Sequence, residues 1–136
     1  LRRALQHRAL ALRPPPAAVV LYGSVARGAA APGDVDLLVV LANAADEEPV
    51  RAALLDATRS LEHRFQIAVH PVVLTTAELE TRRDDPLIAA IASEGLLLSG
   101  RGAGPLRRVR RLPPLLPATD AGRAAVPTVG GAPAPR

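Results

Sequence analysis

The 136-residue chain contains no cysteine, methionine or tryptophan, and all of its 17 basic residues other than histidine are arginines. Without lysine, a Schiff base, a pyridoxal site and the lysine of a P-loop are excluded. Without cysteine, thiol nucleophiles, thiolate zinc sites and disulfides are excluded, so redox chemistry indicates no compartment. The three histidines, His7, His63 and His70, do not form the HExxH pattern of a zinc protease.

Long hydrophobic runs are also lacking. No apolar stretch reaches the roughly 18 residues that a membrane span requires, and no signal peptide is evident, so we expect a soluble cytoplasmic protein without a membrane partner. Apolar residues, mainly Ala, Leu and Val, make up 49% of the chain, enough for one modest core in a single domain. The chain begins at Leu1 rather than methionine, which leaves open that an N-terminal domain is missing.

The formal net charge is +4, and much of the excess lies in Arg107, Arg108, Arg110 and Arg111. Such a cluster can bind a polyanion. Tyr22 and Phe65 are the only aromatic residues, however, so the chain has no stacking platform for single-stranded nucleic acid. We therefore interpret the arginines as a solvated basic edge and expect no nucleic-acid partner for this domain alone.

Apolar periodicity predicts an α/β (α+β) domain with a small mixed sheet flanked by helices. The expected elements are a helix at 1–12, strands at 17–22 and 35–41, a helix at 46–65, a strand at 66–74, a short helix after residue 75, a helix at 86–94 and a strand at 96–98.

Three local signals refine this pattern. Pro71 restricts its strand to an edge or a bulge, because proline has no N–H for the sheet. Thr75 and Glu78 have the spacing of a capping box, and Gly95 suits the C′ position after a helix. The domain is expected to span residues 1–111, and the Pro/Ala/Gly-rich residues 112–136 are expected to be disordered.

The most informative stretch is VVLYGSVARGAAAPGDVDLLVVL, residues 19–41. Asp34 and Asp36 stand at the start of a strand with only Val35 between them, so they project from one side, about 6.5–7 Å apart. Two unpaired carboxylates this close repel each other, and a divalent cation removes the conflict. Mg²⁺ suits such oxygen ligands and takes its remaining ligands from water and phosphates. The pair therefore indicates a metal site that faces a phosphorylated ligand.

The preceding loop fits the same ligand. Gly23, directly after a strand, allows close approach of the backbone, Ser24 offers a hydroxyl, and the amides of the next turn can bind an anion. Arg27 adds a positive charge. Taken singly, Ser24 is more often a helix N-cap, Arg27 a solvated charge, and Gly33 before Asp34 an ordinary turn. The combination in one short window favours the functional interpretation.

With these residues, the segment LYGSVARGAAAPGDVDLLVVL resembles the signature of the minimal nucleotidyltransferases, which have the fold of DNA polymerase beta. The resemblance implies transfer of a nucleoside monophosphate from an NTP, with ATP expected, through two Mg²⁺ ions. It implies that Asp34 and Asp36 are the catalytic metal ligands and that Gly23 and Ser24 contact the triphosphate. Arg27 is carried over as a nucleotide-binding residue or a structural one.

The chain departs from this family at a third carboxylate, which members commonly supply from a following strand. The matching segment, QIAVHPVVLT, contains no acid, and His70 is its only ionisable residue. A neutral imidazole can accept a proton, but a histidine beside Pro71 on an edge strand is more often structural. Asp56 and Glu62, on the preceding helix, are other carboxylates that could reach the site.

Three functions remain open from the sequence. The first is an active bacterial nucleotidyltransferase that modifies a hydroxyl on a protein or a small molecule, for example an antitoxin that adenylylates a HEPN-type toxin. The second is a catalytically degenerate nucleotide-binding or interaction module, which the missing carboxylate suggests. The third is the nucleotidyltransferase part of a DNA-binding regulator whose other domain would precede Leu1.

Overall fold

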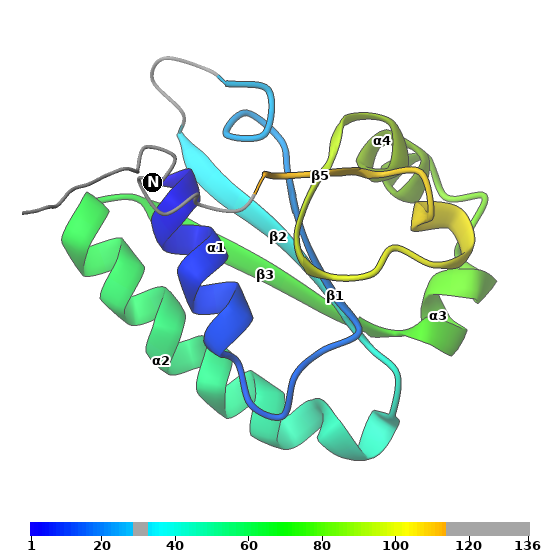
Figure 1. Cartoon of the computed structure of the whole chain (residues 1–136), viewed down its shortest axis with the longest axis horizontal. Helices are drawn as coiled ribbons and strands as arrows, with labels where there is room; N and C mark the ends of the chain where they lie inside the picture. Colours follow the sequence, from blue (N-terminus) through cyan, green and yellow to red (C-terminus); the bar gives the residue numbers. More distant parts are fainter. Residues whose placement is uncertain (29–32, 114–136) are drawn as a thin grey trace, which may run out of the picture.

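The computed structural model describes residues 1–28 and 33–113, which form a five-stranded mixed sheet with helices on both faces (Figure 1). The expected fold class and the expected order of elements are confirmed. The elements are α1 (Arg2–Ala11), β1 (Ala18–Tyr22), β2 (Asp34–Leu41), a 3₁₀ turn (Ala44–Asp46), α2 (Glu47–Phe65), β3 (Ala68–Thr75), α3 (Thr76–Thr81), α4 (Pro86–Glu94), β4 (Leu96–Gly100), a second 3₁₀ turn (Gly104–Leu106) and β5 (Arg110–Arg111).

The strands lie in the order β3-β2-β1-β4-β5. β1 pairs antiparallel with β2 and with β4, whereas β2 pairs parallel with β3 and β4 pairs parallel with β5. At one end of the sheet, Asp36 of β2 stands between Tyr22 of β1 and His70 of β3 in the strand register. Three adjacent strands therefore bring these side chains to one face, because paired residues share a face.

Each face of the sheet carries its own apolar core. Alternate residues of β2 such as Val35, Leu37 and Val39 pack with α1 and α2. Leu38 and Val40, which point the other way, pack with α3, α4 and the second 3₁₀ turn. Both faces of β2 are therefore buried from Leu37 onward, which explains its continuous apolar run.

β3 is an edge strand, as Pro71 predicted, and two N–H groups on its outer edge donate to side chains. The N–H of Val69 donates to Glu62 Oε2 at 2.8 Å, Pro71 has no N–H, and the N–H of Thr75 donates to Glu78 Oε1 at 2.9 Å. Capping edge donors in this way opposes strand addition by another chain. The Thr75–Glu78 contacts form the expected capping box, and the hydrogen bond from Thr75 lowers the pKa of Glu78.

Gly95 has a different role from the one its sequence position predicts. It ends α4 with an extended backbone, φ −70° and ψ 161°, and not with the left-handed conformation expected of a C′ glycine. A Cβ atom there would lie 2.6 Å from the carbonyl oxygen of Ile91 and 2.7 Å from Val20 Cγ1. Glycine is therefore required because α4 turns into β4 directly against β1.

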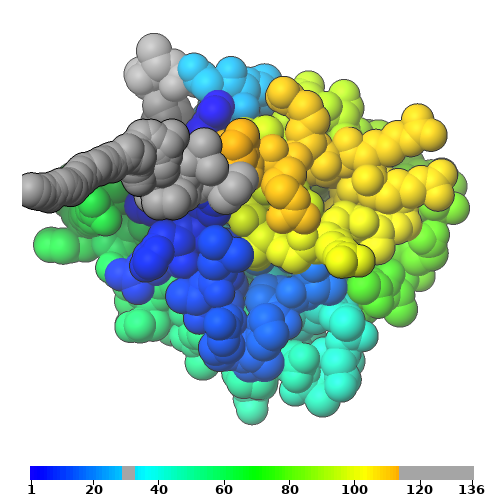
Figure 2. All heavy atoms as spheres, in the orientation of Figure 1, coloured from blue at the N-terminus to red at the C-terminus, as the bar shows by residue number. Residues whose placement is uncertain are grey.

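The short strand β5 was not expected from the sequence. It places Arg110 beside Leu96 at the edge of the sheet, and the basic edge lies at the surface, as Figure 2 shows for the orange segment. Every one of its four arginines is exposed. The segment expected to be disordered, 112–136, lies outside the described residues from 114 onward. No helix within the described ranges has the length and apolar character needed to cross a membrane.

We expect Gly95→Ala to lower the free energy of unfolding by about 1–3 kcal/mol, because backbone and side chain must both move to admit the methyl group. Gly33→Ala is the matched control, since no atom among the described residues lies within 4 Å of a Cβ at that position. Urea denaturation of both variants measures the difference. Equal stabilities would show that the close contact at Gly95 does not constrain the fold.

Candidate functional site

The candidate site lies at the end of the sheet where β1 leaves it and β2 enters it (Figure 1). Gly23 follows β1 directly with φ +79°, a conformation that favours glycine. A Cβ atom at position 23 would lie only 2.6 Å from Asp36 Oδ2. The Asp36 carboxylate therefore lies over the backbone of the Gly-Ser loop, residues 23–28, and a side chain at position 23 would displace it.

The two aspartates share one face, as their spacing predicts. Val35, between them, is fully buried under α1 and α2 on the opposite face. The Asp34 side chain is 53% exposed, and Asp36 is half-buried. Both carboxylates are thus accessible to a ligand, although the rest of the strand is covered.

His70 joins this pair. It stands opposite Asp36 in the parallel register, and its Nε2 lies 3.3 Å from Asp34 Oδ2. Its side chain is 58% exposed, so this contact is open to solvent and its strength is limited by screening. The structure thereby places the only ionisable residue of the 66–75 segment beside the two aspartates.

Tyr22 also belongs to the site, and sequence analysis assigned it no role. It pairs with Asp36 in the antiparallel register. Burial, followed by the negative charge of Asp36, raises the pKa of the Tyr22 phenol above its usual value. The phenol is therefore protonated at neutral pH. Its position directly before Gly23 was the one signal in the sequence that could have identified it.

The Gly-Ser loop is a series of turns. The N–H of Arg27 donates to the carbonyl oxygen of Gly23 at 3.1 Å, and the N–H of Gly28 donates to that of Val25 at the same distance. Residues 24–28 do not form a helix, so Ser24 is not a helix N-cap. The Arg27 guanidinium is directed to α4, where Nη1 lies 3.2 Å from Glu94 Oε1, and both side chains are about half exposed.

Asp56 and Glu62 do not reach the aspartates. Their helix, α2, packs through Val50, Leu54 and Leu61 on the face of the sheet that holds Val35. Asp34 and Asp36 point away from that face. Glu62 is moreover engaged with the N–H of Val69, so the idea that either residue supplies a third carboxylate is wrong.

The donor chemistry of the site suits a hard cation. Among the residues that the structure describes, no group of three or more His, Cys, Asp or Glu side chains is arranged to hold a metal ion. Asp34 and Asp36 nevertheless present carboxylate oxygens on one accessible face. Mg²⁺ is commonly bound by one or two carboxylates and completed by water and substrate phosphates. The residues present therefore fit this ion.

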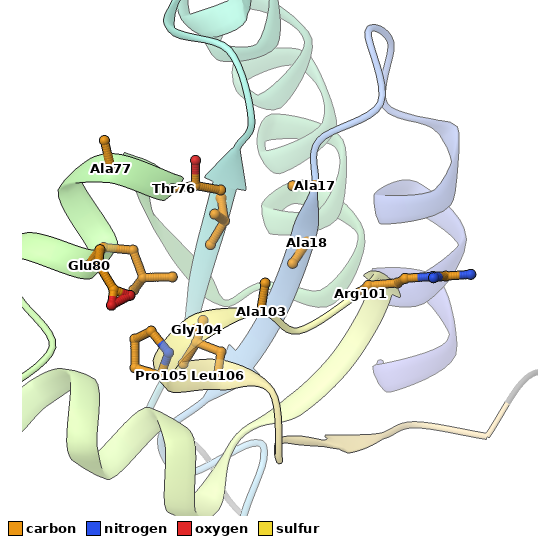
Figure 3. Close-up of a pocket in the computed structure, with 12 residues that line it drawn as sticks. Ala17, Ala18, Thr76, Ala77, Glu80, Arg101, Ala103, Gly104, Pro105 and Leu106 are labelled. Atoms are coloured by element: carbon orange, nitrogen blue, oxygen red, sulfur yellow. The ribbon is translucent and has the colours of Figure 1, made fainter.

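A separate cavity of about 290 Å³ lies at the far end of the same strands (Figure 3). Ala18 and Val40 form part of its wall, four residues along β1 and β2 from the pair formed by Tyr22 and Asp36. Glu80 lies at its rim beside Gly104, whereas the Arg101 side chain points away from it (Figure 3). The cavity contains neither aspartate and is not part of the candidate site.

Comparison with known families gives an independent assignment. The family described as "Nucleotidyltransferase domain" matches residues 2–95, which include the loop, both aspartates and His70. The chain belongs to this nucleotidyltransferase domain family. The resemblance inferred from the Gly-Ser and aspartate motifs is confirmed. No curated protein matches the chain.

Several solved structures show a lower level of similarity. A mutant of the MntA–HpeT toxin–antitoxin is 14% identical, with a TM-score of 0.49 over 74% of this chain and 73% of that chain. A toxin–antitoxin with AMP-PNP is 17% identical, with a TM-score of 0.49 over 73% of each chain. A complex of the tri-AMPylated Shewanella oneidensis HEPN toxin with the MNT antitoxin is 17% identical, with a TM-score of 0.44 over 74% and 73%. The family assignment rests on the family match.

We expect Gly23→Ala to displace the Asp36 carboxylate, because the new methyl group would overlap it. Gly104→Ala is the matched control: its φ is +56°, and its Cβ would meet Glu80 Oε1, at 3.0 Å, beside the cavity at the far end of the sheet. Both variants should lose about 1–2 kcal/mol of stability from the left-handed backbone. Only Gly23→Ala should shift the carboxyl ¹³C resonance of Asp36 in labelled protein. An unchanged Asp36 resonance would contradict the close contact.

Proposed function

We propose that this domain transfers a nucleoside monophosphate from ATP to a hydroxyl acceptor in a Mg²⁺-dependent reaction. One observation carries the proposal: in a member of the nucleotidyltransferase domain family, the backbone at Gly23 passes so near Asp36 that a Cβ atom would lie 2.6 Å from Oδ2, at the sheet end where Asp34 is also exposed. A phosphate-binding loop and a carboxylate pair then face the same ligand.

In this reaction, the acceptor oxygen bonds to the α-phosphorus of ATP, the bond from that phosphorus to the β-phosphate bridging oxygen breaks, and pyrophosphate leaves. Asp34 and Asp36 would hold Mg²⁺, two ions by resemblance to the family. The metal, when bound, supplies positive charge that stabilises the attacking and leaving oxygens. Gly23 and Ser24 would support the triphosphate through the loop backbone and the Ser24 hydroxyl.

The acceptor hydroxyl must lose its proton as the new bond forms. His70 would take this role: its Nε2, 3.3 Å from Asp34 Oδ2, would donate to that carboxylate, and Nδ1 of the neutral imidazole would accept the proton. Arg27 supports the loop through Glu94 in the described structure and would not need to contact phosphate. Tyr22, protonated and next to Gly23, is available as a hydrogen-bond donor.

The acceptor we propose is a hydroxyl on a partner protein. Minimal nucleotidyltransferases, which the Gly23–Asp36 segment resembles, include antitoxins that adenylylate HEPN-type toxins. A toxin of that kind is the first acceptor to test, and the chain would then be the antitoxin of the pair. Radiolabel from α-labelled ATP should appear on the acceptor protein and should persist after denaturation.

Asp34→Asn and Asp36→Asn should each weaken Mg²⁺-dependent ATP binding about tenfold or more, because each removes a charged oxygen ligand. Calorimetric titration with and without Mg²⁺ measures this loss and needs no knowledge of the acceptor. Asp56→Asn is the matched control, since Asp56 is exposed on the far side of the sheet. The proposal is overturned if the folded chain binds ATP equally well with and without Mg²⁺ and neither aspartate substitution weakens that binding.

A second candidate function, nucleotide binding without turnover, is favoured by one specific observation. β3 carries no carboxylate, and His70 occupies the position opposite Asp36. If the chain lacks the family's third carboxylate, wild type should bind ATP without transferring it, and His70→Asp should introduce measurable transfer by adding an acid there. His63→Asp, on an exposed part of α2, is the control. Wild-type transfer that His70→Asp abolishes would instead favour the active enzyme, with His70 as its base.

A further inference from the structure

Arg2 of the N-terminal helix donates hydrogen bonds to the Gly-Ser loop, whose Val25 and Ala26 side chains are also buried in the core that holds Leu5 and Ala9. Arg2 Nε donates to the carbonyl oxygen of Val25 at 3.2 Å, and Nη2 donates to the same oxygen at 3.0 Å and to that of Ala26 at 3.1 Å. These contacts join residues 23 and 24 positions apart in the chain. Figure 1 shows the start of α1 and this loop at the same end of the sheet.

The contacts determine how the loop presents its backbone. In a trans peptide, the C=O and the following N–H point in opposite directions. With the Val25 carbonyl held toward Arg2, the N–H of Ala26 points away from α1. The turn bonds of Arg27 and Gly28 to Gly23 and Val25 complete the arrangement. Arg2 thus orients backbone dipoles in the loop that rests against Asp36.

The guanidinium is itself held in place. Leu5 and Ala9 of α1 are buried in the core formed by β1, β2 and β4, so the helix is fixed to the sheet. The other side-chain link from this loop, Arg27 to Glu94, is about half exposed on both partners and is correspondingly weak. The partly buried Arg2 contacts are charge-assisted, which makes them the stronger constraint.

We propose that Arg2 is a positioning residue that holds the Gly-Ser loop in the conformation that receives the nucleotide's phosphates. The proposal rests on the proposed function, since the loop is taken to bind a triphosphate. Arg2 acts through the carbonyls of Val25 and Ala26 and does not contact the ligand. The planar guanidinium is required because its Nε and Nη2 both donate to the Val25 carbonyl oxygen while Nη2 also donates to that of Ala26. A lysine ammonium cannot make these three bonds with the same geometry.

The test compares Arg2→Ala and Arg2→Lys with the control Arg3→Ala, an exposed arginine one position along the same helix. Amide hydrogen exchange is measured in the free protein, and ATP affinity is measured by calorimetry with Mg²⁺. We expect exchange at residues 24–28 to rise about tenfold in Arg2→Ala, with β1 and β4 amides unchanged. ATP affinity should fall about tenfold in Arg2→Ala. Arg2→Lys should weaken it several-fold despite its retained charge.

The two readouts separate this proposal from the proposed function. Loop exchange equal to wild type in Arg2→Ala would overturn the positioning role, whether or not ATP binds. ATP affinity fully retained in Arg2→Lys together with wild-type loop exchange would show that only charge matters, which also overturns it. If wild type fails to bind ATP while amide exchange at residues 24–28 still rises in Arg2→Ala, the proposed function is wrong. Arg2 would then still position the loop, but not for a phosphate ligand.

Discussion

The antiparallel register between β1 and β2 is the constraint on which the rest of the site depends. It pairs Tyr22 with Asp36, so the residue after the strand, Gly23, meets the Asp36 carboxylate. A slip of one residue would turn Asp34 and Asp36 toward α1 and α2, and would place Val35 on the open face. The register is held by the cores on both sides of β2, and the same burial that stabilises the sheet therefore fixes the orientation of the two carboxylates.

The position of the site along β2 follows from where the helices stop covering the sheet. Leu38 and Val40 are buried against α3, α4 and the second 3₁₀ turn, whereas Asp34 and Asp36 lie on the same face beyond that cover. Polar side chains are tolerated there because solvent reaches them. On the other face the cover continues to Val35. The start of β2, residues 34–36, is therefore covered on one face of the sheet and accessible to solvent on the other.

Sequence patterns predicted most of this arrangement, because periodicity and the Asp34-Val35-Asp36 spacing are local. They correctly assigned the strand at 35–41 that is buried on both faces, the edge strand marked by Pro71 and the capping box at Thr75. They did not predict the requirement for Gly95, which comes from its contact with Val20 of another strand. They also gave no sign of Arg2, since its acceptors are backbone carbonyls, which carry no residue identity, more than twenty positions away.

The arginines near the loop bear on how a triphosphate would be held. Arg2 is engaged with two carbonyl oxygens and Arg27 with Glu94, so in the described structure both guanidiniums beside the loop already have partners. The chain has no lysine to offer instead. Negative charge on a ligand at this end of the sheet would thus be met by oriented backbone amides and by metal held on Asp34 and Asp36. Because amides carry only partial charges, the geometry of the loop matters more here than its net charge.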